Sequence, residues 1–104
     1  MREIVLVRLD KTRPALVLTR EVARGAMNKV TIAPITSTVR GLSSEVLVGP
    51  DNGLGHRCAV SLDRVLTIPG SALGRTIGHL RADQEAQLAR AVVLAYDLEV
   101  ALLE

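Results

Sequence analysis

Aromatic side chains are almost missing from this chain of 104 residues. It has no tryptophan and no phenylalanine, and Tyr96 is its single aromatic residue. Aliphatic side chains must therefore fill the interior, which favours a small, tightly packed body rich in β-strands. A set of aromatic platforms on which nucleic-acid bases could stack is excluded. A chain this short predicts one domain, spanning residues 1–104.

Cysteine is equally scarce, because Cys58 is the only one. This excludes an intramolecular disulfide and a cysteine-rich zinc site. Cys58 lies in the strand-like run RCAVSLD, and we interpret it as a small buried thiol rather than a catalytic thiolate. The sequence also has no basic and apolar leader, and no apolar run as long as a membrane span. We expect a cytoplasmic protein that does not contact a membrane.

Charge of one sign is not in large excess. The formal net charge is +2 and the isoelectric point is about 9.2, which is too weak an imbalance to diagnose nucleic-acid binding. The basic residues nevertheless concentrate before the midpoint of the chain and the acidic ones toward its end. No acidic, histidine or cysteine residues show the clustered spacing of metal ligands, so we expect neither a metal nor another cofactor.

Short apolar runs separated by turn residues predict most of the secondary structure. Pro34 should place its strand at an edge or a bulge, because proline donates no ladder hydrogen bond. The segment around Ala72 could hold one helical turn. The expected strands span residues 2–9, 14–20, 28–36, 45–49, 57–63, 64–69 and 76–80.

From Asp83 onward the apolar period becomes helical. One stripe of this predicted helix contains Leu88, Ala91, Val92, Ala95, Leu98 and Leu102, whereas Gln84, Gln87, Arg90 and Asp97 fall elsewhere. Five to seven short strands followed by one amphipathic helix predict a mainly β fold, either a small barrel or a sandwich.

Two of the predicted strands carry a polar group where a buried strand should end. Arg13 stands at the start of one apolar run, and Thr36 closes another. A guanidinium and a hydroxyl at two strand ends could handle a phosphate together. By composition alone, each could also be an ordinary turn or ladder residue. An alternative pair, His56 and His79, would act as base and acid in a pancreatic-ribonuclease manner, although exposed bystanders are the simpler interpretation of both.

Several short motifs follow one another in an order that is typical of a known family. These are R-P-[AV]-L-V at residues 13–17, P-[IL]-T-[ST] at 34–37, a G-L turn at 53–54, CAVSLD at 58–63, and I-G-x-L at 77–80. In this order and at this spacing, the chain resembles the MazF/PemK family of sequence-specific endoribonuclease toxins. The resemblance implies an SH3-like or CcdB-like barrel of antiparallel strands with a C-terminal helix. It also implies a homodimer and a cognate MazE-like antitoxin.

The resemblance further implies metal-independent cleavage of single-stranded RNA, whether mRNA, rRNA or tRNA. The ribose 2′-hydroxyl would attack the phosphate, leaving a 2′,3′-cyclic phosphate and a 5′-hydroxyl. Arg13 and Thr36 would be the catalytic residues. Other residues that we expect to contact RNA are Lys11, Thr12, Arg20, Ser37, Thr38, Arg40 and Arg57.

The chain departs from the family's pattern in two places. The loop before Arg13 is short, and the cation of D-[QN]-[IV]-R-T-I has moved or been lost, because this chain has Leu66 there and Arg64 two residues earlier. Two other functions stay open: a CcdB-like toxin that poisons gyrase without catalysis, and a non-catalytic barrel that binds RNA or protein.

Overall fold

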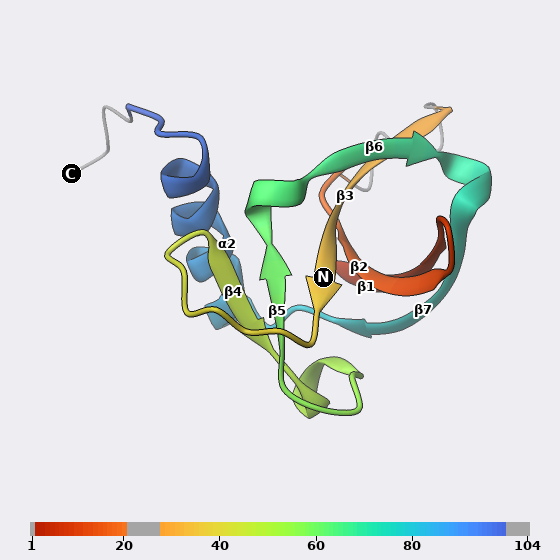
Figure 1. Ribbon diagram of the computed structural model, residues 1–104, viewed down its shortest axis with the longest axis horizontal. Helices are drawn as coiled ribbons and strands as arrows, with labels where there is room; N and C mark the ends of the chain where they lie inside the picture. The colour runs from red at the N-terminus through yellow and green to blue at the C-terminus, as the bar shows by residue number, and fades with distance from the viewer. Residues whose placement is uncertain (1, 21–27, 100–104) are drawn as a thin grey trace.

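The computed structural model describes residues 2–20 and 28–99 and shows a strongly curled antiparallel sheet with one helix packed beside it (Figure 1). This confirms the predicted mainly β fold with a C-terminal helix. The described residues also contain three single 3₁₀ turns, η1 (Pro50–Asn52), η2 (Leu62–Arg64) and η3 (Gly70–Ala72), the last at the predicted position. The strands are β1 (Glu3–Arg8), β2 (Thr12–Val17), β3 (Lys29–Thr36), β4 (Glu45–Val48), β5 (Cys58–Ser61), β6 (Leu66–Pro69) and β7 (Leu73–His79).

The strands lie in the order β4-β5-β3-β2-β1-β7, and β6 also pairs with β3. β3 therefore has β2 along one edge and two successive partners along the other. Its first half, residues 29–32, pairs with β6, and its last two residues pair with β5. This change of partner lets the sheet curl into the ring seen in Figure 1.

Pro34 was expected at a sheet edge or a bulge, and it does not lie at an edge. Pro34 is opposite Ala15 of β2 in the interior of the sheet. On its other side it falls between Ile32, the last residue paired with β6, and Ile35, the first paired with β5. A residue that donates no ladder hydrogen bond is tolerated at such a break between partners.

Aliphatic residues form two core clusters on the two sides of the sheet. One lies between the sheet and the helix and includes Ile4, Leu16 and Leu88. The other fills the ring and includes Val7, Ala15 and Ile32. Cys58 belongs to the first cluster, and burial raises the pKa of its thiol, which disfavours the reactive thiolate and agrees with a packing role.

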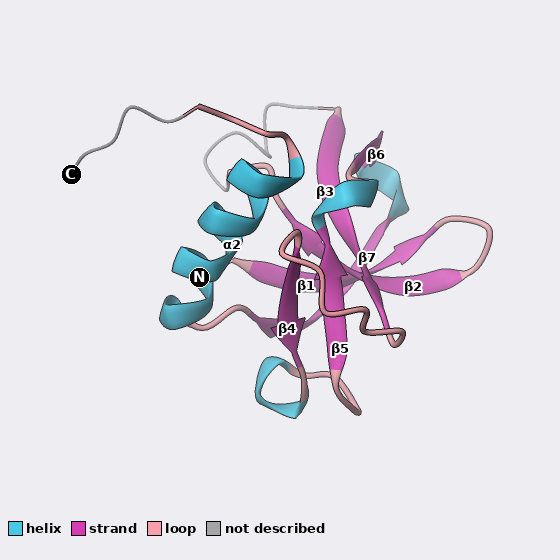
Figure 2. Cartoon of the chain, turned by 60° about the vertical axis from the view of Figure 1, so that its left-hand side comes forward, coloured by secondary structure: helices cyan, strands magenta, loops and turns pink. Residues whose placement is uncertain are grey.

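Helix α2 (Ala82–Ala95) packs its apolar stripe against the first cluster, with Leu88 and Ala91 buried. Figure 2 shows the helix lying along one side of the strands. The prediction that the stripe continues through Leu98 was wrong. The helix ends at Ala95, Asp97 adopts a left-handed φ of 52°, and Leu98 is 49% exposed. Leu102 lies outside the described residues.

Gln84 was expected on the polar side of the helix, but the structure buries it. Its Nε2 donates to the Leu47 carbonyl at 3.0 Å, and its Oε1 accepts from Asn52 Nδ2 at 2.7 Å. Asn52, which is also buried, donates to the His79 carbonyl as well. A buried amide is tolerated when its hydrogen bonds are made in this way. The pair joins the start of α2 to β4 and η1.

No helix among residues 2–20 and 28–99 has the length and hydropathy needed to cross a membrane.

Two glycines allow the turn after η1 to pack directly on β7. A Cβ atom at Gly78 would lie 1.7 Å from the Asn52 carbonyl oxygen, and one at Gly53, where φ is 87°, would lie 1.9 Å from that of Ile77. Both contacts are with backbone atoms, so no side chain can move aside. This close approach also positions the buried Asn52.

We predict that Gly78→Ala lowers the free energy of unfolding by more than about 2 kcal/mol, because the turn and β7 must separate. Chemical denaturation would measure the change. Gly55→Ala is the matched control, since a Cβ there meets nothing within 4 Å, and it should leave stability nearly unchanged. Equal stability of the two variants would contradict the packing described.

Candidate active site

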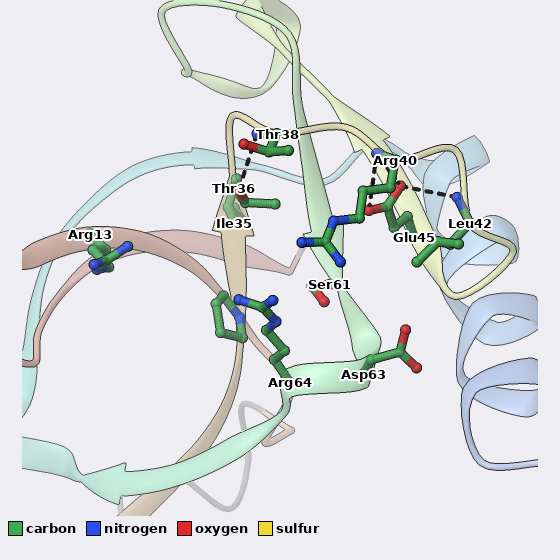
Figure 3. Close-up of a pocket in the computed structure, with 11 residues that line it drawn as sticks. Arg13, Ile35, Thr36, Thr38, Arg40, Leu42, Glu45, Ser61, Asp63 and Arg64 are labelled. Carbon is green, nitrogen blue, oxygen red and sulfur yellow. Dashed lines mark hydrogen bonds between the residues drawn. The ribbon is translucent and has the colours of Figure 1, made fainter.

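The register of β2 against β3 brings Arg13 and Thr36 to the same end of the sheet. Ala15 pairs with Pro34, Leu16 with Ala33 and Val17 with Ile32. Extending this antiparallel register by two residues places Arg13 opposite Thr36, just beyond the last paired position. Both residues line one cavity of about 260 Å³ (Figure 3). The structure thus brings together the two residues that the sequence singled out.

Arg13 keeps most of its hydrogen-bonding capacity. Its Nε lies 3.7 Å from Asp10 Oδ1, and the side chains are 46% and 76% exposed. An ion pair this open to solvent is weak. The guanidinium can therefore turn its planar set of donors toward an anion in the cavity, for which phosphate oxygens are a good geometric match.

Thr36 is oriented by the first residues of the loop that follows β3. Its Oγ1 accepts a hydrogen bond from the backbone N–H of Thr38 at 3.1 Å. This bond uses the oxygen as an acceptor and leaves the hydroxyl proton free for a second partner. A half-buried hydroxyl at the cavity wall is thus available as a donor.

The loop between β3 and β4 is tied down by Glu45, which the sequence analysis did not single out. Its Oε1 accepts from the backbone N–H groups of Arg40, Gly41 and Leu42 at 3.2, 2.9 and 3.2 Å. A carboxylate accepting several backbone donors makes strong, charge-assisted bonds. Glu45 thereby fixes the part of the loop that carries Arg40 to the cavity. An acidic residue a few positions after a glycine turn is too common a pattern to have revealed this.

The opposite wall of the cavity consists of Ser61, Asp63 and Arg64. These residues come from the end of β5 and from η2. Asp63 accepts a hydrogen bond from the buried Ser44 hydroxyl. None of the three was proposed as a site residue from the sequence. The sequence offered one signal for Arg64, namely its cation two residues before the position typical of the family. It could not show that Arg64 would line this cavity, because the turn η2 decides where the side chain lies.

The other residues expected to contact RNA do not all join this cavity. Thr38 and Arg40 line it together with Arg13 and Thr36. Thr12 instead lines a separate hollow with Arg8 and Arg75. Arg57 lies in a third hollow, beside Arg81. The remaining three residues line none of these hollows and are exposed: Lys11, Arg20 and Ser37.

The two histidines lie outside the cavity that contains Arg13 and Thr36. His56 and His79 are both exposed, and neither lines the cavity that contains Arg13. Within residues 2–20 and 28–99, no three side chains of histidine, cysteine, aspartate or glutamate gather as a metal site would require.

The fold and the site define a small, mainly β protein that has a polar, guanidinium-lined cavity at one end of its curled sheet. Comparison with known proteins is more specific. Residues 2–96 match the model of the PemK-like, MazF-like toxins of type II toxin–antitoxin systems. This chain belongs to that family.

Individual relatives agree with this assignment. The chain is 54% identical over 99 residues to "Endoribonuclease MazF3" of Mycobacterium tuberculosis, covering 95% of this chain and 96% of that protein. The solved structure of the Mycobacterium tuberculosis toxin MazF-mt6 is 52% identical, with a TM-score of 0.93, and covers 95% of this chain and all of that one. A mycobacterial endoribonuclease in complex with its cognate antitoxin shares the fold at 20% identity, with a TM-score of 0.84 over 94% of both chains.

We predict that Glu45→Ala increases amide hydrogen exchange at Arg40, Gly41 and Leu42 by about tenfold or more, because their common acceptor is lost. Exchange measured by NMR would resolve the three amides. Glu45→Gln is the matched control, since its amide oxygen can still accept, and it should show a smaller rise. Unchanged exchange in Glu45→Ala would show that the carboxylate does not hold the loop.

Proposed function

We propose that this protein is the toxin of a type II toxin–antitoxin pair and acts as a metal-independent endoribonuclease on single-stranded RNA. The observation that carries the proposal is the convergence of Arg13 and Thr36 on one cavity. Family membership and the names of the relatives support it. Cutting mRNA, rRNA or tRNA would stop translation and growth, and we accordingly place its action in the cytoplasm.

The proposed reaction is an in-line attack of the ribose 2′-hydroxyl on the adjacent phosphorus. The bond to the 5′-oxygen of the next nucleotide breaks, which gives a 2′,3′-cyclic phosphate and a 5′-hydroxyl end. Negative charge grows on the non-bridging oxygens as the pentacoordinate transition state forms. Arg13 would stabilise this charge with its fork of donors, and the free proton of Thr36 would bond to one of the same oxygens.

Arg13 could also supply the proton that the leaving 5′-oxygen needs, although arginine is a weak acid. Electrostatic stabilisation is therefore the main role that we assign to it. The position of the cavity at strand ends agrees with this role, since the rigid sheet fixes where both side chains begin.

The cavity and the relatives together favour catalysis over the two alternatives. A gyrase poison that acts through its C-terminal residues needs no polar cavity at the start of β2 and the end of β3, and residues 100–104 lie outside the described part. A barrel that only binds RNA could use the same donors, so family membership and the names of the relatives are what favour catalysis over it.

We further propose a homodimer and a cognate MazE-like antitoxin. Leu47, Leu94 and Tyr96 are apolar side chains that are each 45–52% exposed, and association with a second copy could cover them. The cationic cavity would accept acidic side chains from an antitoxin, which would block it by charge complementarity.

We predict that the purified protein cuts a long RNA at discrete sites in excess chelator, leaving cyclic phosphate ends. Arg13→Ala should abolish the cuts, and Thr36→Ala should slow them by roughly 10²–10³-fold, because each removes a transition-state donor. Primer extension would map the cuts, and end-specific ligation would identify the termini.

Two controls separate loss of chemistry from loss of folding. Thr36→Ser keeps the hydroxyl and should retain most activity, whereas Arg90→Ala removes an exposed arginine of α2 and should cut like the unaltered protein. Intact RNA together with gyrase-dependent DNA breaks would instead support the gyrase poison. Intact nucleic acids in both assays would support a binding barrel.

A further inference from the structure

The cavity holds two guanidinium groups besides that of Arg13. Arg40 enters from the loop after β3, and Arg64 enters from η2 on the opposite wall. Figure 3 shows the two side chains extending toward the same space between β3 and β5. Both residues are exposed, and neither forms an ion pair with a carboxylate of residues 2–20 or 28–99.

The two carboxylates of the cavity are held by other donors. Glu45 accepts from three backbone N–H groups of the loop. Asp63 accepts from Ser44, and its side chain is turned away from Arg64 (Figure 3). The cavity is lined by three arginines and two acidic residues, so its net charge is +1. The guanidinium groups of Arg40 and Arg64, rather than the two carboxylates, extend into the open space of the cavity.

Two guanidinium groups that face one another repel unless an anion lies between them. A phosphodiester suits such a position, because its two non-bridging oxygens can each accept from one planar fork of donors. Arg13 and Thr36 already converge on one phosphate in the proposed function, which leaves a neighbouring phosphate as a partner for Arg40 and Arg64.

We propose that Arg64, together with Arg40, binds the phosphate next to the scissile one and so fixes which phosphodiester reaches Arg13. This inference rests on the proposed function and makes Arg64 a positioning residue. Phosphate contacts set the register of a strand without reading its bases. Arg40 and Arg64 would therefore bind the phosphate equally well whatever the bases of the RNA are.

The test uses the full chain and an RNA oligonucleotide that spans a cut mapped in a long RNA. A 2′-deoxy sugar at the cut prevents cleavage, and two further oligonucleotides each carry one neutral methylphosphonate at a phosphate flanking the cut. Affinity is measured by fluorescence anisotropy at several salt concentrations. The variants are Arg64→Gln, Arg40→Gln, Arg64→Lys and, as a matched control, Arg90→Gln.

We expect Arg64→Gln to bind on the order of 10- to 100-fold more weakly, the effect of losing a hydrogen bond to a charged group. Its salt slope should fall by about 0.7, as for one phosphate contact on a single strand. One methylphosphonate should weaken the unaltered protein most and should weaken Arg64→Gln and Arg40→Gln less, because each variant keeps only one of the two arginines. Arg64→Lys should keep the salt slope and bind more weakly, and Arg90→Gln should match the unaltered protein.

In cleavage of the all-ribose oligonucleotide, Arg64→Gln should raise KM far more than it lowers kcat. The inference would be overturned if Arg64→Gln bound the RNA as tightly as Arg90→Gln does. It would also be overturned if each methylphosphonate weakened Arg64→Gln as much as it weakens the unaltered protein. These outcomes are distinct from failure of the proposed function, in which the unaltered protein would leave the long RNA uncut at the first step.

Discussion

The antiparallel register between β2 and β3 is the constraint on which the site depends. Three backbone pairings, from Ala15–Pro34 to Val17–Ile32, determine that the beginning of one strand meets the end of the other. A slip of one residue would turn every side chain of β2 to the other face of the sheet. Ala15 and Val17 would then leave the cluster inside the ring, so burial of apolar surface enforces the same register that places Arg13 beside Thr36.

The change of partner along β3 builds the rest of the cavity. Because β6 leaves β3 after Ile32 and β5 joins it at Ile35, the turn η2 between β5 and β6 must lie close to the end of β3. That turn brings Arg64 to the cavity. The loop on the other side is fixed by Glu45 at the start of β4. A few backbone pairings and one carboxylate thus position three arginines from different parts of the chain.

The cavity attracts anions mainly because its two carboxylates are bonded to other groups, and not because the protein has a large net positive charge. The chain as a whole carries only +2. Within the cavity, however, the carboxylates of Glu45 and Asp63 bond to the loop backbone and to Ser44, while the guanidinium groups stay open to a ligand. A polyanion that enters the cavity would therefore contact the guanidinium donors before it reached either carboxylate. This is how a nearly neutral protein without aromatic platforms could present the phosphate site that we propose.

The sequence by itself determined which apolar runs form strands, the terminal helix, and Arg13 and Thr36 as a pair near two strand ends, because the apolar period is a local property. It did not fix the bounds of β2, β5 and β7, which differ from the expected ones by up to three residues at either end. It could not place Pro34 inside the sheet, bury Gln84, or end the helix before Leu98, since each depends on partners distant in the chain. Nor could it tell that Arg64 enters the cavity and Arg57 does not. Only the tertiary structure decided these, because strand pairing sets which loops meet in space, and that pairing is enforced by core packing between residues far apart in the sequence.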